Sequence, residues 1–125
     1  QSFAERIITT LSDHAFSIFA IDVDGDGDVD ALSASPSDDT RERRVRVLLI
    51  AWYENDGSES FTERVVTTLA DAAHSVFAID VDGDGDVDAL SASREDDTVA
   101  WYENDGSESF TERIISNSAD GAMSV

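Results

Sequence analysis

The chain repeats itself, and this repetition constrains its fold more than any other feature. Residues 51–64 (AWYENDGSESFTER) recur unchanged at residues 100–113, an offset of 49 positions. Residues 22–35 (DVDGDGDVDALSAS) recur at residues 80–93, an offset of 58. Because the second offset is nine residues longer, the first copy carries an insertion between Thr40 and Ala51. Such a period indicates a repeat architecture, in which each unit buries its apolar face against a neighbour.

Each unit has the pattern of four short β-strands. In the second copy, residues 75–79, 87–93, 98–102 and 110–115 are rich in β-formers or alternate between apolar and polar side chains. Asn104-Asp105-Gly106 is a tight-turn signature before the last of these segments. A four-stranded antiparallel sheet repeated about every 40 to 50 residues is typical of a β-propeller blade. We therefore predict an all-β fold of β-propeller blades, about two per chain.

The repeat boundaries divide the chain into four parts. We expect residues 15–69 to form the first blade, with the insertion at residues 41–50, and residues 70–118 to form the second. Residues 1–14 contain FAERIITTL, which matches residues 61–69 and 110–118 and predicts a leading outer strand. Residues 119–125 match the start of a further blade. Two blades are thus accompanied by three outer-strand segments.

Both copies carry the same acidic loop. Asp22, Asp24 and Asp26 occupy positions 1, 3 and 5, and Gly27 occupies position 6, where the chain must turn sharply. This is the oxygen spacing of a calcium loop, in which position 7 offers its backbone carbonyl and position 9 a carboxylate. The predicted metal ligands of the two loops are Asp22, Asp24, Asp26, Asp28, Asp30, Asp80, Asp82, Asp84, Asp86 and Asp88. We expect about two Ca²⁺ ions per chain, because the ions offset the repulsion among the carboxylates.

The residues around these loops exclude two helical calcium modules. Position 12, a bidentate glutamate in an EF-hand, is Ser33 or Ser91 here. The flanking segments have β-strand patterns, which also argues against a dockerin-like module. Magnesium is a weaker interpretation than calcium, because Mg²⁺ keeps more of its waters and seldom takes an all-protein cage.

A DxDxDGxxD loop between two strands, followed by a WYEND strand and a glycine approach to the next strand, resembles the FG-GAP/VCBS repeat. These repeats form the blades of integrin-alpha-like β-propellers, and the resemblance covers nearly the whole chain. It implies a calcium loop between the first and second strands of each blade, with a largely structural role for the ion. It also implies adhesion, sugar binding or interaction rather than catalysis, and an extracellular or cell-surface location.

The charge of the chain limits its partners. With 8 basic residues against 28 acidic ones the net charge is −20, which argues against nucleic acid and anionic membranes and favours polyvalent cations. The chain has no cysteine, so disulfides are excluded. The longest apolar-rich run, residues 45–53, is far shorter than the roughly 20 residues of a membrane span, and no membrane insertion is expected.

Four aromatic residues are candidate ligand contacts: Trp52, Tyr53, Trp101 and Tyr102. They could stack on sugars in a lectin-like propeller, or pack between blades, and neighbours on a strand point to opposite faces, so both interpretations stay open. His74 aligns with Phe16 and Met123, which indicates a packing position. His14 aligns with Ala72, and we predict no catalytic residue and no enzymatic activity.

Two blades do not close a propeller, which needs roughly four to eight. We therefore expect a homo-oligomer that forms one ring, a trimer or a tetramer. The alternative is a fragment or an engineered amplification of a larger propeller without activity of its own. The insertion RERRVRVLLI holds four of the eight basic residues, and it is either a lengthened hairpin or a docking edge. The predicted function is a calcium-stabilised module with a structural or adhesive role and a protein or glycan ligand.

Overall fold

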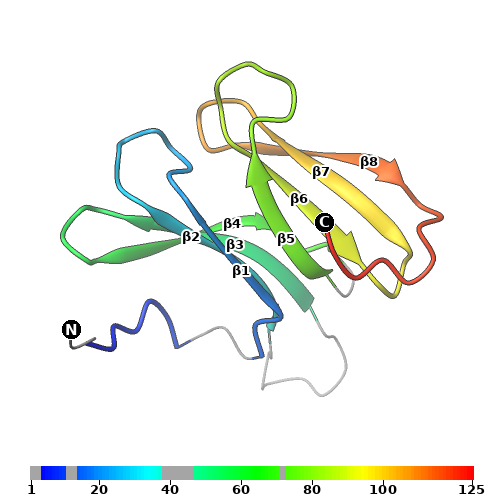
Figure 1. Cartoon of the computed structure of the whole chain (residues 1–125), viewed down its shortest axis with the longest axis horizontal. Helices are drawn as coiled ribbons and strands as arrows, with labels where there is room; N and C mark the ends of the chain where they lie inside the picture. The colour runs from blue at the N-terminus through cyan, green and yellow to red at the C-terminus, as the bar shows by residue number, and fades with distance from the viewer. Residues whose placement is uncertain (1–3, 11–13, 38–46, 71–72) are drawn as a thin grey trace.

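The computed structural model describes residues 4–10, 14–37, 47–70 and 73–125, which form two antiparallel sheets (Figure 1). The first sheet has the order β1-β2-β3-β4 and the second β5-β6-β7-β8, so each is a meander. The strands are β1 (Ser17–Ile21), β2 (Asp30–Ser37), β3 (Val47–Asn55), β4 (Phe61–Thr67), β5 (Ala73–Ile79), β6 (Asp88–Ser93), β7 (Thr98–Asn104) and β8 (Phe110–Ser116). The prediction of an all-β chain with two four-stranded units is confirmed. No helix occurs in the described residues, and so none there is long and apolar enough to cross a membrane.

The two sheets share one register because they share one sequence. Leu32 lies opposite Trp52 in the first sheet, and Leu90 lies opposite Trp101 in the second. The pairing of β3 with β4 shifts after Ile50, and that of β7 with β8 shifts at the equivalent place. Short polar turns join β3 to β4, β6 to β7 and β7 to β8, as expected for alternating segments of this length. The structure thus repeats this bulge in both blades, whereas the shift between Ala73 and Ser75 in the pairing of β5 with β6 has no counterpart in the pairing of β1 with β2.

The main core lies between the sheets, which contact each other through opposite faces. The first sheet contributes Leu32, Ile50 and Trp52, and the second contributes Ala89 and Tyr102. Strand β5 contacts β1, β2 and β3 of the first sheet. Alternate side chains of a strand point to opposite faces of its sheet, so each sheet has a second face. Within the described residues, no sheet packs on that second face.

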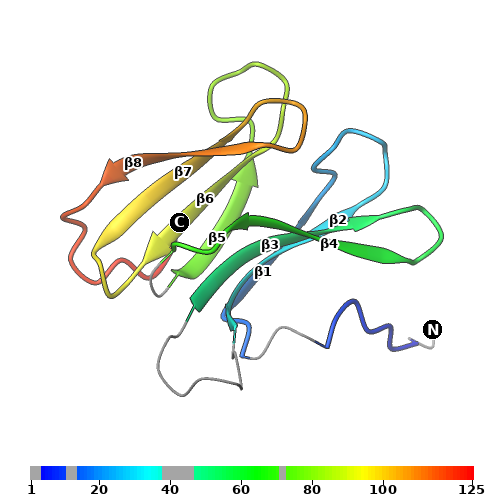
Figure 2. The same ribbon diagram turned by 180° about the vertical axis from the view of Figure 1, so that it is seen from behind.

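The described residues at the two ends of the chain form no strand, whereas the end of the insertion belongs to β3. Residues 4–10 contain no strand and run beside the first sheet in both views (Figures 1 and 2). Residues 119–125 contain no strand either. The assignment of residues 1–14 to a leading outer strand and of residues 119–125 to the start of a further blade stays a prediction. Of the insertion, residues 41–46 lie outside the described residues, whereas residues 47–50 begin β3 and pair with β2.

The acidic loops lie where the sequence predicts them, between the first and second strands of each sheet. Residues 22–29 join β1 to β2, and residues 80–87 join β5 to β6. Both loops project from the same end of the molecule (Figures 1 and 2). The turns that join β3 to β4 and β7 to β8 begin at Asn55 and Asn104, and each contacts the acidic loop of its own sheet.

Candidate metal centre

The first acidic loop is folded by its own carboxylates. Asp22 accepts hydrogen bonds from the backbone of Gly25 at 2.8 Å and of Gly27 at 2.9 Å. The backbone of Asp26 donates to Asp24, and that of Asp28 donates to Asp26. Gly27 has a φ of 98°, a conformation that side chains rarely adopt and that explains the glycine at position 6. The second loop repeats these bonds, with Asp80 accepting from Gly83 and Gly85.

Asp30 and its equivalent Asp88 are the buried members of the loops, only 2% and 1% exposed. The carboxylate of Asp30 accepts from the backbone of Val23 at 2.9 Å and from that of Asn55 at 2.8 Å. Asp88 accepts from Val81 and Asn104 at the same two distances. Each carboxylate therefore ties the start of its loop to the end of the third strand.

Asn55 and Asn104 close the contact from the other side. The side-chain amide of Asn55 donates to the carbonyl of Val29 at 3.2 Å, and that of Asn104 donates to the carbonyl of Val87 at 3.1 Å. Sequence reasoning assigned these residues to a turn and missed their role in holding the loop. The signal was present, because the same asparagine follows both WYE segments, but its partner lies 26 residues away in the first copy.

Three of the predicted ligands converge in each loop. One carboxylate oxygen from each of Asp22, Asp24 and Asp30 lies within 4.8 Å of the others, and Asp80, Asp82 and Asp88 form the same group. The structure does not bring Asp26 or Asp84 into these groups. Three hard oxygen donors of one charge around one point are a donor set that suits a divalent cation.

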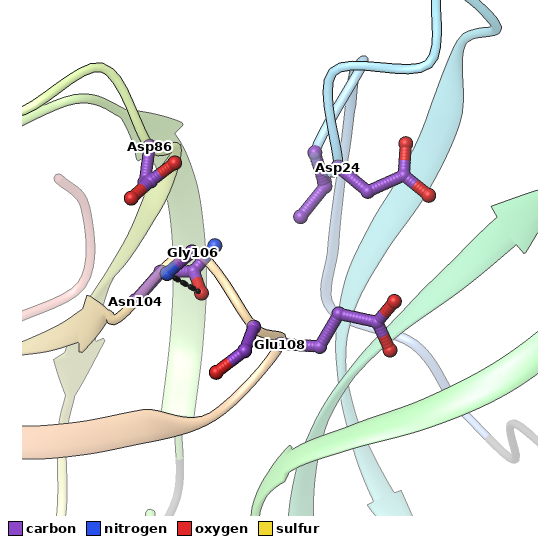
Figure 3. Close-up of a pocket in the computed structure, with 7 residues that line it drawn as sticks. Asp24, Asp86, Asn104, Gly106 and Glu108 are labelled. Atoms are coloured by element: carbon purple, nitrogen blue, oxygen red, sulfur yellow. Dashed lines mark hydrogen bonds between the residues drawn. The ribbon is translucent and has the colours of Figure 1, made fainter.

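Asp28 and Asp86 turn their carboxylates toward the neighbouring turn. A Cβ atom on Gly57 would lie 2.5 Å from Oδ2 of Asp28, and one on Gly106 would lie 2.5 Å from Oδ2 of Asp86 (Figure 3). These side chains therefore pack on the glycine of the Asn-Asp-Gly turn. This placement is compatible with the sequence prediction that position 7 offers its backbone carbonyl to the ion.

The electrostatics of the loops favour a bound cation. Burial raises the pKa of Asp24 and of Asp30 above the ordinary value of 3.8, and the neighbouring charges of Asp22 and Asp26 add to the effect. Loss of solvation also raises the pKa of Asp82 in the second loop, where Asp84 and Asp88 contribute. A raised pKa means that the ionised carboxylates are disfavoured where they stand. A divalent ion would reverse that cost.

The turns beside the loops have the opposite electrostatics. Asp56 accepts hydrogen bonds from the hydroxyl and the backbone of Ser58 and from the backbone of Ser60. The bonds from Ser58 hold the pKa of Asp56 below its ordinary value, and Asp105 in the second sheet behaves in the same way. These carboxylates are occupied by their own turns and are poor candidates for ligands.

Three of the four candidate ligand-contact rings are buried. Trp52 is 0%, Tyr53 3% and Tyr102 1% exposed, whereas Trp101 is half-buried with the guanidinium of Arg113 5.9 Å from its ring centroid. Sugar contact at these residues stays a prediction, with Trp101 the accessible member. His74 stacks on Phe16 with ring centroids 4.9 Å apart, and His14 is exposed in a turn with a φ of 58°.

A groove of about 390 Å³ separates the two acidic loops (Figure 3). Val23 and Asp24 line it from the first sheet, and Asp86, Asn104 and Glu108 line it from the second. Near it, Arg64 of β4 bonds Glu54 at 2.7 Å and reaches Glu108 of the second sheet at 3.5 Å. The groove is therefore acidic, and one ion pair between the sheets lies beside it.

Comparisons with known proteins agree with this geometry. The FG-GAP-like repeat matches residues 22–91 and again residues 80–125, so that each match begins at the first aspartate of an acidic loop. No curated protein and no solved structure gave a significant match. The two matches together span most of the chain, whose residues form two four-stranded antiparallel sheets, and the chain therefore belongs to the FG-GAP-like repeat family.

Proposed function

We propose that this chain is a calcium-binding β-propeller module in which each acidic loop holds one Ca²⁺ ion for a structural purpose. The observation that carries the proposal is the convergence of three carboxylates within 4.8 Å in both loops, one of them buried and fixed by two backbone donors. The side chains of Asp22, Asp24 and Asp30 would hold the first ion, with Asp26 and the carbonyl of Asp28 completing the set. Asp80, Asp82, Asp88, Asp84 and the carbonyl of Asp86 would do the same in the second loop.

The donor set favours calcium over other metals. Each site offers only oxygen atoms, and neither histidine nor cysteine joins the described acidic groups, which argues against zinc and copper. Calcium accepts six to eight oxygens in flexible geometry, whereas magnesium demands a smaller octahedron and retains water. The backbone carbonyl and water can complete a calcium shell that three or four carboxylates begin.

The role of the ion follows from what the loop connects. Asp30 bonds the backbone at both Val23 and Asn55, so an ion on Asp30 would link the loop between β1 and β2 to the end of β3. When bound, the ion supplies positive charge that offsets carboxylate repulsion, and it adds no chemistry to a substrate. We propose a structural and adhesive module, extracellular or at the cell surface, and not an enzyme. The family and the acidic surface support this proposal.

Calcium titration by calorimetry tests the proposal directly. The wild-type chain should bind two ions, Asp24→Ala and Asp82→Ala should each bind one because alanine removes the ligating oxygen, and the double variant should bind none. Asp56→Ala is the matched control, because Asp56 is an exposed acid committed to its own turn, and it should still bind two. At a free calcium concentration 100 times Kd, each site should add about 2.7 kcal/mol to the free energy of unfolding.

The calcium titration tests the assignment of the sites, and the melting temperature tests the structural role of the ion. A wild-type chain that takes up no calcium, or a double variant that still takes up two ions, would refute the assignment of the sites. A melting temperature that is the same in calcium and in EDTA would refute the structural role even if calcium bound.

A further inference from the structure

The contact between the two sheets provides a reference for what a neighbouring blade looks like. Outer strand β4 places Arg64 3.5 Å from Glu108 of the second sheet and packs Val66 against the core shared with Tyr102. Inner strand β5 donates a hydrogen bond from the backbone of Val76 to the hydroxyl of Ser17 at 3.2 Å. These contacts mark the outer and inner ends of one interface between blades.

The leading segment reproduces the outer contacts on the open face of the first sheet. Arg6 matches Arg64 in the repeat, and it lies 3.1 Å from Glu59, the residue that matches Glu108. Ile8 matches Val66, and it packs against Ala31, Ala51 and Tyr53, which match Ala89, Ala100 and Tyr102. Residues 4–10 therefore occupy the place that the outer strand of a preceding blade would take.

The last residues reproduce the inner contact on the open face of the second sheet. The backbone of Val125 donates to the hydroxyl of Ser75 at 3.3 Å. Val125 matches Val76, and Ser75 matches Ser17, so this bond repeats the one between the sheets. Residues 122–125 thus lie where the inner strand of a following blade would begin.

Two exposed apolar side chains show what these segments leave uncovered. Ile18 is 66% exposed, whereas Val76 at the same repeat position is 4% exposed because it faces the first sheet. Ile115 is 57% exposed, whereas the equivalent Val66 is half-buried against the second sheet. Both differences arise only because no blade follows β8 or precedes β1 in the described residues.

We propose that a second copy of this chain docks head to tail on these faces, and that the chain's own ends compete with it. The second sheet of one copy would pack on the first sheet of the next, so that its Ile115 replaces the partner copy's Ile8 and its Arg113 replaces Arg6 on Glu59. Strand β1 of the next copy, the inner strand of its first sheet, would replace residues 122–125 of the copy on which it docks. The two faces are made of the same repeat positions that already pack within one chain, so a copy of the same sequence fits both.

The docking is heterologous and leaves a free face on each end, so it continues until a ring closes. With two blades per chain, three or four copies give six or eight blades, which is within the known range for propellers. None of the contacts that carry this inference involves a carboxylate of the acidic loops, so association and calcium binding can be measured separately.

The first test is sedimentation equilibrium of paired variants in β8, each compared with the wild type across a range of concentrations. Ile115→Glu should lower the association constant at least about tenfold, because it removes a buried apolar side chain and places a charge in the interface. Ile114→Glu is the matched control. Ile114 is 53% exposed, and its equivalent Val65 remains 53% exposed beside a packed blade, so this position lies outside the interface.

The second test concerns the leading segment. Arg6→Glu breaks the pair with Glu59 and should raise the association constant by up to about fivefold, because an exposed ion pair stabilises the resident segment only modestly. Arg94→Glu changes the net charge equally in an exposed turn between β6 and β7 and should leave association unchanged or slightly weaker. Circular dichroism of the same samples shows whether each variant is folded.

Each result bears on the proposal. A wild-type mass that stays at 13.5 kDa at the highest concentration, while the chain is folded, would overturn docking by a second copy and leave these faces to other blades. Equal association of Ile115→Glu and Ile114→Glu would overturn the assigned interface. Equal association of Arg6→Glu and Arg94→Glu would overturn the competition by the leading segment. Calcium titration by calorimetry measures the metal sites separately. A failure of the proposed docking is therefore distinguished from a failure of the proposed calcium binding.

Discussion

Replacing Asp30 by asparagine in metal-free protein tests how the acidic loop is attached to its sheet. Asp30 is 2% exposed, and its two oxygens accept separate backbone hydrogen bonds from Val23 and Asn55. An asparagine side chain has one acceptor oxygen, so Asp30→Asn leaves one buried N–H without a partner. That loss costs about 1–3 kcal/mol.

A second effect acts in the opposite direction. The charges of Asp26 and Asp22 help to raise the pKa of Asp30, and the amide removes that repulsion. We therefore expect a net loss in the lower part of the range, about 1–2 kcal/mol, which is a substantial share of the roughly 5–15 kcal/mol of a typical domain. Asp26→Asn removes the same charge and keeps an acceptor for the backbone of Asp28, so its expected cost is near zero.

Urea unfolding in EDTA, followed by tryptophan fluorescence and circular dichroism, gives the free energy of unfolding of both variants. Working without calcium separates the hydrogen bonds from any ligand effect. If Asp30→Asn were as stable as Asp26→Asn, the two backbone hydrogen bonds would not hold the loop to β3, and our account of the site would be wrong.

Three further predictions follow from single residues. Gly106→Ala should destabilise the chain by up to about 1 kcal/mol more than Gly121→Ala in urea unfolding, because both glycines have positive φ but only the first would meet a carboxylate, at 2.5 Å, which must then move aside; equal losses would exclude a role for that contact. Burial raises the pKa of Tyr102 to about 12, so stability should fall above about pH 10, where the unfolded chain releases this proton first, and Tyr102→Phe should weaken that dependence. In EDTA the melting temperature should fall as pH rises from 3.8 through the raised pKa values of Asp24 and Asp30, because the native state holds protons there that the unfolded state has lost; a rise over this window would contradict our reading of the loop.

The sequence predicted the blades because local pattern decides them. The alternating segments that end in Ser93 and begin at Thr98 become β6 and β7, and the glycines of the acidic loops adopt the positive φ that the turns need. The aspartate spacing also predicted which loop would gather carboxylates. It did not predict that Asp26 stays outside the group, because ligand spacing describes an ion-bound loop, whereas hydrogen bonds to the backbone compete for the same oxygens.

The burial of the aromatic residues was beyond sequence reasoning for a clear reason. Trp52 and Trp101 stand in identical fourteen-residue segments, yet Trp52 is fully buried and Trp101 is only half-buried. The difference comes from the neighbouring blade, since a sheet packs on the face of Trp52, whereas no sheet in the described part of the chain packs on that of Trp101. In a repeat protein, identical local sequence therefore does not determine how buried a residue is. The position of its repeat within the array determines the burial.

Hydrogen bonds connect the acidic loop of the second blade to the turn that contacts the first blade. Asn104 bonds both Asp88 and the carbonyl of Val87, and it is the first residue of the turn that carries Glu108. Glu108 has a φ of 63° and reaches Arg64 of the preceding blade, so the strained turn that presents it is held by the asparagine that also holds the loop. An ion that stiffens Asp88 would stiffen this turn, and through it the ion pair between blades. A structural ion at the loop thus has a physical route to the stability of the array as well as to that of its own blade.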